Sequence, residues 1–254
     1  MRVLALDTTA RAGSVALVID GRVVEERRGD PARTHAERLP GDLTALLDDY
    51  ALKTGDIDLF AVASGPGLFT GLRIGIATVQ GLAFVHHRKI AAVSAFEALA
   101  HMASADLAAG ALVAVWMDAQ RRDVFTAAYR VAPFPAYDPA RLLELESPAV
   151  GEPAATLDRW RRLFGDEPMA IAGDGAVQWS GTIGAAFKDA RIMPPPALAG
   201  AIGRIALAHD AGGLSMRPDA VRPLYVRRPD AEIERDKRVA KDAERAEDAK
   251  TGQS

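Results

Sequence analysis

Short apolar runs separated by polar turns fill the start of the chain and predict strands. Residues 2–9 (RVLALDTT) are apolar until Asp7. Residues 13–28 hold two runs that read as strands. They are joined by Asp20-Gly21, a strong signal for a β-hairpin with a two-residue loop. A turn is expected at residues 8–12. The chain therefore opens with three consecutive strands, each antiparallel to the one before it.

Helical spacing of apolar residues begins after Thr34. Leu39, Leu43, Leu46, Leu47 and Tyr50 recur every three or four positions, which predicts an amphipathic helix. Further along, LFAVASGPG at 59–67 predicts a buried strand that enters a glycine turn. A helix at 70–87, a short strand at 90–93 and a helix at 95–108 follow. Within about the first 90 residues the order of elements is β-β-β-α-β-α.

The second half resembles a diverged copy of the first. Residues 111–130 predict a strand that ends at Asp118, a polar turn and another strand, and a proline-rich loop follows. Helices are expected at about 152–164, from 176, and between the prolines at 194–196 and the glycines at 212–213. MAIAGDGA at 169–176 predicts a strand that enters a glycine turn, and residues 221–228 a last extended segment.

We therefore predict an α/β fold with two lobes, residues 1–94 and 95–228, and a charged tail at 229–254. Residues 231–250 carry 13 charges in 20 positions, seven acidic and six basic. Few apolar residues remain in this segment, and their burial could not offset the entropy lost on ordering. We therefore expect this tail to be disordered.

Composition narrows the function classes. The 254 residues are 49% hydrophobic and 26% charged, with a formal net charge of −3, which gives no basic footprint for unaided nucleic-acid binding. The absence of cysteine excludes disulfides, thiolate zinc sites and cysteine nucleophiles. Five scattered histidines do not suggest a metal site. No run approaches the roughly 20 apolar residues of a membrane span, and we expect a cytoplasmic protein.

The stretch SGPGLFTGLRIG at 64–75 resembles a phosphate-binding loop without matching one. Its spacing fits neither G-x-x-x-x-G-K-[ST] nor G-x-G-x-x-G. A tight strand-to-helix turn without ligand and an anion site at the helix N-terminus both remain open. The helix that follows is apolar on every face, so it needs cover on every face, from this chain or from a partner.

Asp7 and Asp118 each end a strand before a short polar turn. Paired strand-turn-strand units of this kind grip the phosphates of ATP in the actin-like ATPase fold, which has two β-β-β-α-β-α lobes. The same aspartates are also ordinary turn residues, and the sequence alone does not choose between these roles.

Six segments in this order and spacing resemble the TsaB (YeaZ) family: MRVLALDTT, GSVAL, SGPGLFTGLRIG, VSAFEALA, MDAQRRDVFTAAY and RPLYVRR. Leu68 stands where the family usually has serine. The resemblance implies the actin-like ATPase (ASKHA) fold. It also implies a role in forming N6-threonylcarbamoyladenosine (t6A) at position 37 of tRNA, as a partner of the catalytic relative TsaD. Ala95 and Leu99 stand where TsaD carries two metal-binding histidines, so the resemblance implies no metal site and no catalytic residue here.

The resemblance also implies partners and sites. The expected partners are a TsaD-like catalytic subunit and a TsaE-like ATPase, with a homodimer in isolation and tRNA bound only through the complex. No cofactor is required, although ATP is a candidate for weak binding or for the complex interface. The expected partner interface consists of Leu39, Leu43, Leu46, Thr70, Gly71, Arg73, Ile74, Ala77, Thr78 and Gly81. The candidate residues for weak nucleotide binding are Asp7, Thr8, Gly65, Gly67, Asp118, Gly173 and Gly175.

Two variants test that interface: Gly75→Leu and Ala77→Arg should abolish partner binding and leave the monomer folded. The alternative functions are an enzyme of the same fold, such as a small-molecule kinase or a metal-dependent transferase or protease, and a nucleotide-binding regulator. Tight ATP binding by the isolated chain would favour either alternative.

Overall fold

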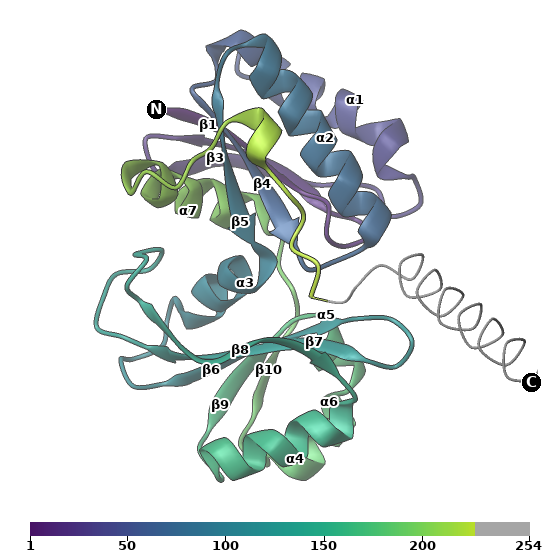
Figure 1. Cartoon of the computed structure of the whole chain (residues 1–254), viewed down its shortest axis with the longest axis vertical. Coiled ribbons are helices and arrows are strands. Elements are labelled where there is room, and N and C mark those ends of the chain that lie inside the picture. Colours follow the sequence, from purple (N-terminus) through teal and green to yellow (C-terminus); the bar gives the residue numbers. More distant parts are fainter. Residues whose placement is uncertain (227–254) are drawn as a thin grey trace, which may run out of the picture. The chain divides into compact units, whose positions relative to one another are not determined.

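The computed structural model describes residues 1–226, of which residues 1–224 form one compact unit. The predicted tail at 229–254 lies outside the described residues. Two five-stranded mixed sheets organise this unit (Figure 1).

The first sheet has the order β3-β2-β1-β4-β5. Its strands are β1 (Arg2–Asp7), β2 (Ser14–Ile19), β3 (Arg22–Arg28), β4 (Leu59–Gly65) and β5 (Lys89–Ser94). β1 pairs antiparallel with β2 and parallel with β4, so Leu4 lies opposite both Leu17 and Phe60. The predicted hairpin is confirmed, because Asp20 and Gly21 join β2 to β3 with φ values of 49° and 80°.

Helices cover both faces of this sheet. α1 (His35–Asp48) and α2 (Phe69–Val85) enclose the apolar core on one face, into which Leu4 and Leu6 point. α7 (Ala199–Ala211) packs on the other face, where a Cβ added at Gly203 would lie 3.2 Å from the Cβ of Ala5. Burial on both faces explains why β1 is a continuous apolar run rather than an alternating one.

The second sheet has the order β10-β9-β6-β7-β8. Its strands are β6 (Leu112–Asp118), β7 (Val124–Val131), β8 (Leu142–Gly151), β9 (Met169–Ala172) and β10 (Arg191–Met193). α4 (Pro153–Phe164), α5 (Asp174–Gln178) and α6 (Ser180–Ala186) follow the chain around one face. There the Trp116 and Trp160 rings meet edge to face, with centroids 5.2 Å apart.

The hydrophobic pattern does not predict β8 or β10. β8 contains Pro148, and its register shifts twice against β7, so its side chains do not alternate regularly between apolar and polar. β10 has only three residues, which is too short to show a period.

α3 (Ala95–Ser104) packs against the second sheet and alongside α7 (Figure 1). The predicted lobe boundaries placed α7 with the second sheet, whereas its contacts are mainly with the first. Beyond α7, Met216 bridges to Ile90, and Gln80 donates to the carbonyl of Pro218 at the short helix η2 (Pro218–Ala220). Another short helix, η1 (Thr54–Asp56), precedes β4. None of the helices within residues 1–226 has the length and apolarity that a bilayer crossing needs.

Candidate functional site

The turn after β1 is closed by its own side chains. The Asp7 carboxylate is buried, 4% exposed, and accepts hydrogen bonds from the backbone N–H and the hydroxyl of Thr9 at 2.9 and 2.6 Å. Burial raises the pKa of Asp7, while the two bonds from Thr9 act to lower it. The carboxylate therefore acts as the acceptor that shapes this turn.

α1 holds the far side of the same turn through two side chains that sequence analysis did not select. Arg38 donates to the carbonyl of Ala12 and to Nδ1 of His35, the latter at 2.8 Å. Nε2 of His35 must then carry the proton and donate to the carbonyl of Ala10, 3.1 Å away. Burial and the neighbouring Arg38 lower the pKa of His35, which favours this neutral form. The sequence signal that could have identified His35 and Arg38 is a polar side chain at a helix position where the pattern is otherwise apolar.

The glycine-rich loop packs directly onto this turn. The backbone N–H of Leu68 donates to the carbonyl of Thr9 at 2.8 Å, and a Cβ added at Gly67 would lie 2.5 Å from the Cβ of Thr9. A Cβ at Gly65 would lie 2.8 Å from the carbonyl oxygen of Leu224. The room that these two glycines leave is filled by protein atoms of the same chain.

Two glycines of α2 are also explained within the chain. A Cβ at Gly71 would lie 2.2 Å from the Thr8 carbonyl oxygen, and one at Gly75 would lie 2.2 Å from the Thr8 hydroxyl. Gly71 is therefore a buried contact with the turn after β1 and not part of an exposed partner surface. The expectation that Gly75→Leu leaves the monomer folded is wrong for the same reason, because leucine has no space there.

The turn after β6 repeats the arrangement in the second sheet. Asp118 accepts from the backbone N–H and the side-chain amide of Gln120 at 2.9 and 2.7 Å, and its own N–H donates to Asp174 at 2.9 Å. A Cβ at Gly173 would lie 2.2 Å from the carbonyl oxygen of Trp116, and one at Gly175 would lie 2.8 Å from the carbonyl carbon of Met117. These glycines allow the β9–α5 turn to pack on β6.

The glycines on both turns are explained by packing within the chain. At Gly67, Gly173 and Gly175, the position of an added Cβ is taken by Thr9 or by β6. Nucleotide binding at the seven candidate residues stays a prediction.

The expected partner interface divides into a buried and an exposed set. Leu39, Leu43 and Leu46 are 1%, 5% and 0% exposed and belong to the core beneath α1, which corrects their assignment to a surface. Ile74 and Thr78 are half-buried, and the Thr78 hydroxyl donates to the carbonyl of Ile74 at 2.8 Å. The exposed members of the expected interface are Thr70, Arg73, Ala77 and Gly81, all on α2.

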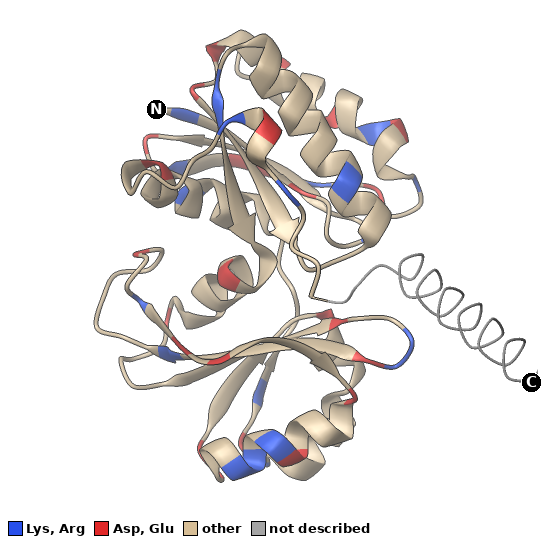
Figure 2. Ribbon diagram, in the orientation of Figure 1, with Lys and Arg blue, Asp and Glu red and all other residues tan. Residues whose placement is uncertain are grey.

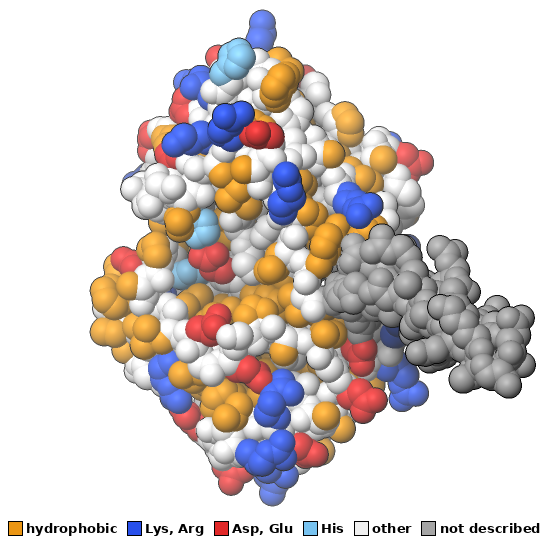
Figure 3. Space-filling view, in the orientation of Figure 1, with side chains coloured by type: hydrophobic (Ala, Val, Ile, Leu, Met, Phe, Trp, Pro, Cys, Tyr) orange, Lys and Arg blue, Asp and Glu red, His pale blue; other side chains and the backbone are white. Residues whose placement is uncertain are grey.

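Sequence analysis missed two residues at the end of this exposed stripe. Phe84 and Val85 are 73% and 67% exposed, although both are large and apolar. The sequence of α2 holds one charged residue, Arg73, so the ribbon of α2 is almost entirely tan in Figure 2, and Figure 3 shows mostly uncharged side chains over the part of α2 that faces the viewer. The outer face of α2, which we define as Thr70, Arg73, Ala77, Gly81, Phe84 and Val85, is therefore weakly charged and partly apolar.

The two positions that the resemblance matches to the TsaD histidines lie on α3. Ala95 and Leu99 are buried, 0% and 1% exposed, and neither side chain can ligate a metal. Within residues 1–226, no three histidine, aspartate or glutamate side chains are grouped so that they could hold a metal ion.

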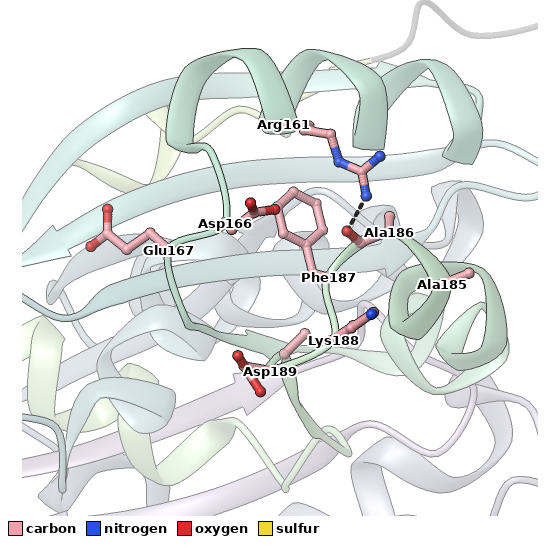
Figure 4. A pocket seen from close by; sticks show the side chains of 9 residues that line it. Arg161, Asp166, Glu167, Ala185, Ala186, Phe187, Lys188 and Asp189 are labelled. Carbon is pink, nitrogen blue, oxygen red and sulfur yellow. Dashed lines mark hydrogen bonds between the residues drawn. The ribbon is translucent and has the colours of Figure 1, made fainter.

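A surface pocket of about 250 Å³ lies between the end of α4 and the α6–β10 loop (Figure 4). Arg161 and Lys188 bring positive charge to its lining, and Asp166, Glu167 and Asp189 bring negative charge. Arg161 donates to the carbonyl of Ala186, which holds the two walls together. Since the charges nearly balance, they select no ligand class.

The two mixed sheets, the hairpin openings of both halves and the flanking helices define an α/β protein of the actin-like ATPase fold. The structure of YeaZ from Pseudomonas aeruginosa matches with a TM-score of 0.68 and 28% identity, over 88% of this chain and 99% of that one. A family model described as TsaD, tRNA N6-adenosine threonylcarbamoyltransferase, matches residues 29–154.

The Escherichia coli protein TsaB, a tRNA threonylcarbamoyladenosine biosynthesis protein, is 30% identical over 230 residues, which are 89% of this chain and 95% of that protein. A Mycobacterium leprae protein is 30% identical over 90% of this chain, and the chain spans 55% of the length of that relative. The chain belongs to the TsaB family, whose members take part in t6A modification of tRNA.

Proposed function

We propose that this chain is a non-catalytic subunit of the t6A-forming assembly and that it binds a TsaD-like catalytic subunit through the outer face of α2. The observation that carries the proposal is Gly81. Apart from the backbone of its own helix and its chain neighbours, no heavy atom of the described residues lies within 4 Å of a Cβ added there, so the fold itself does not need glycine at this position. Glycine inside a helix costs about 1 kcal/mol against alanine, and close approach by a partner helix would explain it.

The neighbours of Gly81 support the same proposal. Ala77 lies one turn before it, and the exposed apolar residues Phe84 and Val85 follow it. Small side chains allow two helices to approach closely, and large apolar ones gain most from burial in the centre of an interface. On α1, Gly41 is likewise exposed, with no described heavy atom within 4 Å of an added Cβ.

The non-catalytic role rests on two groups of residues. Ala95 and Leu99 offer no metal ligand, and Asp7 and Asp118 are engaged as acceptors in their own turns. The TsaD-like subunit would then supply the chemistry, with a TsaE-like ATPase as a third component. Any ATP would bind at an interface of the assembly, or only weakly to this subunit.

The test mixes this chain with the TsaD-like subunit of the same organism and measures mass by size-exclusion chromatography with light scattering, and affinity by calorimetry. Ala77→Arg and Gly81→Arg place a charge on the outer face of α2. Each should weaken binding by about 30-fold or more, as expected for a disrupted interface centre. Ala155→Arg, on an exposed position of α4, is the matched control and should bind like wild type.

Wild-type affinity in both α2 variants would remove this face from the interface. If the unmodified chain forms no complex even with the TsaE-like ATPase and ATP present, the subunit proposal fails. ATP turnover by the isolated chain would instead favour an enzyme of the same fold.

A further inference from the structure

A ten-residue loop connects β7 to β8, and we call residues 132–141 the strap. Its base is closed by a hydrogen bond from the N–H of Ala132 to the carbonyl of Arg141 at 2.7 Å. The Arg141 side chain is buried and donates to the Ser104 hydroxyl and to the Leu107 carbonyl, both at 3.2 Å. It also donates to the carbonyls of Ser104 and Phe134. The base of the strap is thus anchored at the C-terminal end of α3.

The tip of the strap is held differently, by one aromatic ring between two helices. The Tyr137 ring stacks on His101 of α3, with centroids 5.7 Å apart and planes at 20°. The guanidinium carbon of Arg204, on α7, lies 3.9 Å from the centroid of the same ring. A cation this close to a ring centroid is attracted by the π-electrons of the ring.

Tyr137 adopts an unfavourable backbone conformation at this tip. Its φ is 68°, in the left-handed region that bulky residues rarely occupy. Such a conformation persists where the surroundings impose it. The structure shows two constraints at Tyr137: the stack between His101 and Arg204, and a turn closed by the hydrogen bond from the N–H of Asp138 to the carbonyl of Pro135 at 3.2 Å.

The contact with Arg204 joins parts of the protein that belong to different sheets. The strap extends from the second sheet, whereas α7 packs on the first sheet. A second tie runs between the same pair of helices, since Nε2 of His209 lies 3.0 Å from a carboxylate oxygen of Glu97. Movement of one sheet relative to the other would have to break the Tyr137–Arg204 contact.

We propose that the strap is a releasable clasp that sets the relative position of the two sheets, and that the Tyr137 ring is the part that opens. The base is buried and fixed by several hydrogen bonds, while Tyr137 and Arg204 are only half-buried. The tip can therefore leave α7 while the base stays on α3. This inference is independent of the partner interface on α2.

The absence of cysteine makes a direct distance measurement practical. Thr44 on α1 and Arg162 on α4 are both exposed, so Thr44→Cys and Arg162→Cys can each carry a spin label. One label then reports on the first sheet and the other on the second. Pulsed electron paramagnetic resonance on the full chain should give one narrow distance distribution. Tyr137→Ala should broaden it or add a second population. Tyr137→Phe, which keeps the ring under Arg204, should preserve the narrow one.

Arg204→Gln removes the cation from the α7 side and leaves the strap sequence intact, so it should broaden the distribution as Tyr137→Ala does. Circular dichroism and the melting temperature establish that each labelled variant is folded, and Arg204→Gln carries the test if Tyr137→Ala is not. A narrow distribution in the folded ring-less and cation-less variants would overturn the proposal. A broad distribution in the unmodified chain would also overturn it.

Discussion

His101 should make the protein lose stability in mild acid. Its side chain is 1% exposed on α3, and Nδ1 has no hydrogen-bond partner within residues 1–226. Burial lowers the pKa of His101 from 6.5 to about 4, and the positive charge of Arg141 and the neighbouring His209 act in the same direction. Glu97 opposes them. The folded protein therefore keeps this ring neutral at pH values where the unfolded chain protonates it.

The sign follows from the two pKa values. Because the folded pKa lies below the unfolded one, protons bind preferentially to the unfolded chain, and stability falls as the pH drops below about 6.5. The full loss, reached below pH 4, is on the order of 3 kcal/mol for a difference of this size. At pH 5 about 2 kcal/mol of it should already be lost.

The assay is urea unfolding at pH 7.5, 6 and 5, for wild type and for His101→Phe, which keeps a ring against Tyr137. The free energy of unfolding of wild type should fall by about 2 kcal/mol more than that of the variant. The comparison cancels the other titrating groups, including buried Asp7, whose raised pKa acts in the opposite direction. His87→Gln, at an exposed histidine, is the matched control. Equal acid losses in wild type and His101→Phe would refute the reasoning.

Three other substitutions test the packing around the first sheet by the same unfolding measurement. Gly75→Ala should destabilise by about 1–3 kcal/mol, because its Cβ meets the Thr8 hydroxyl, whereas Gly81→Ala should stabilise by up to about 1 kcal/mol. Equal effects at the two glycines would contradict the distinction between them. Ser14→Ala should cost about 1 kcal/mol, because the Ser14 hydroxyl accepts from the N–H groups of Leu198 and Ala199 at the start of α7, at 3.2 and 3.0 Å; an unchanged midpoint would show that this cap is not needed.

The first half of the fold could be read from local patterns. The hairpin at Asp20-Gly21 depends on turn chemistry between adjacent strands, and the helix after Thr34 on the spacing of four leucines. Both signals are contained in a few neighbouring residues, so no distant contact is needed to recognise them. The family resemblance also came from contiguous motifs.

The sheet positions of β8, β10 and α7 required the tertiary structure. β8 has bulges and a proline, and β10 has only three residues. α7 packs on the first sheet although more than a hundred residues separate it from β5, the last strand of that sheet. Contacts between residues so distant in sequence leave no periodic signal at either segment.

The sequence by itself determined the actin-like fold and the family. It placed three leucines of α1 and two glycines of α2 at a single expected interface and expected Gly75→Leu to disrupt it, because an apolar or small residue has the same identity whether the chain or a partner covers it. Only the tertiary structure separated Gly75, which Thr8 approaches, from Gly81, which nothing within the described chain approaches. Burial is a property of what lies opposite a side chain, and that is decided when distant segments pack together.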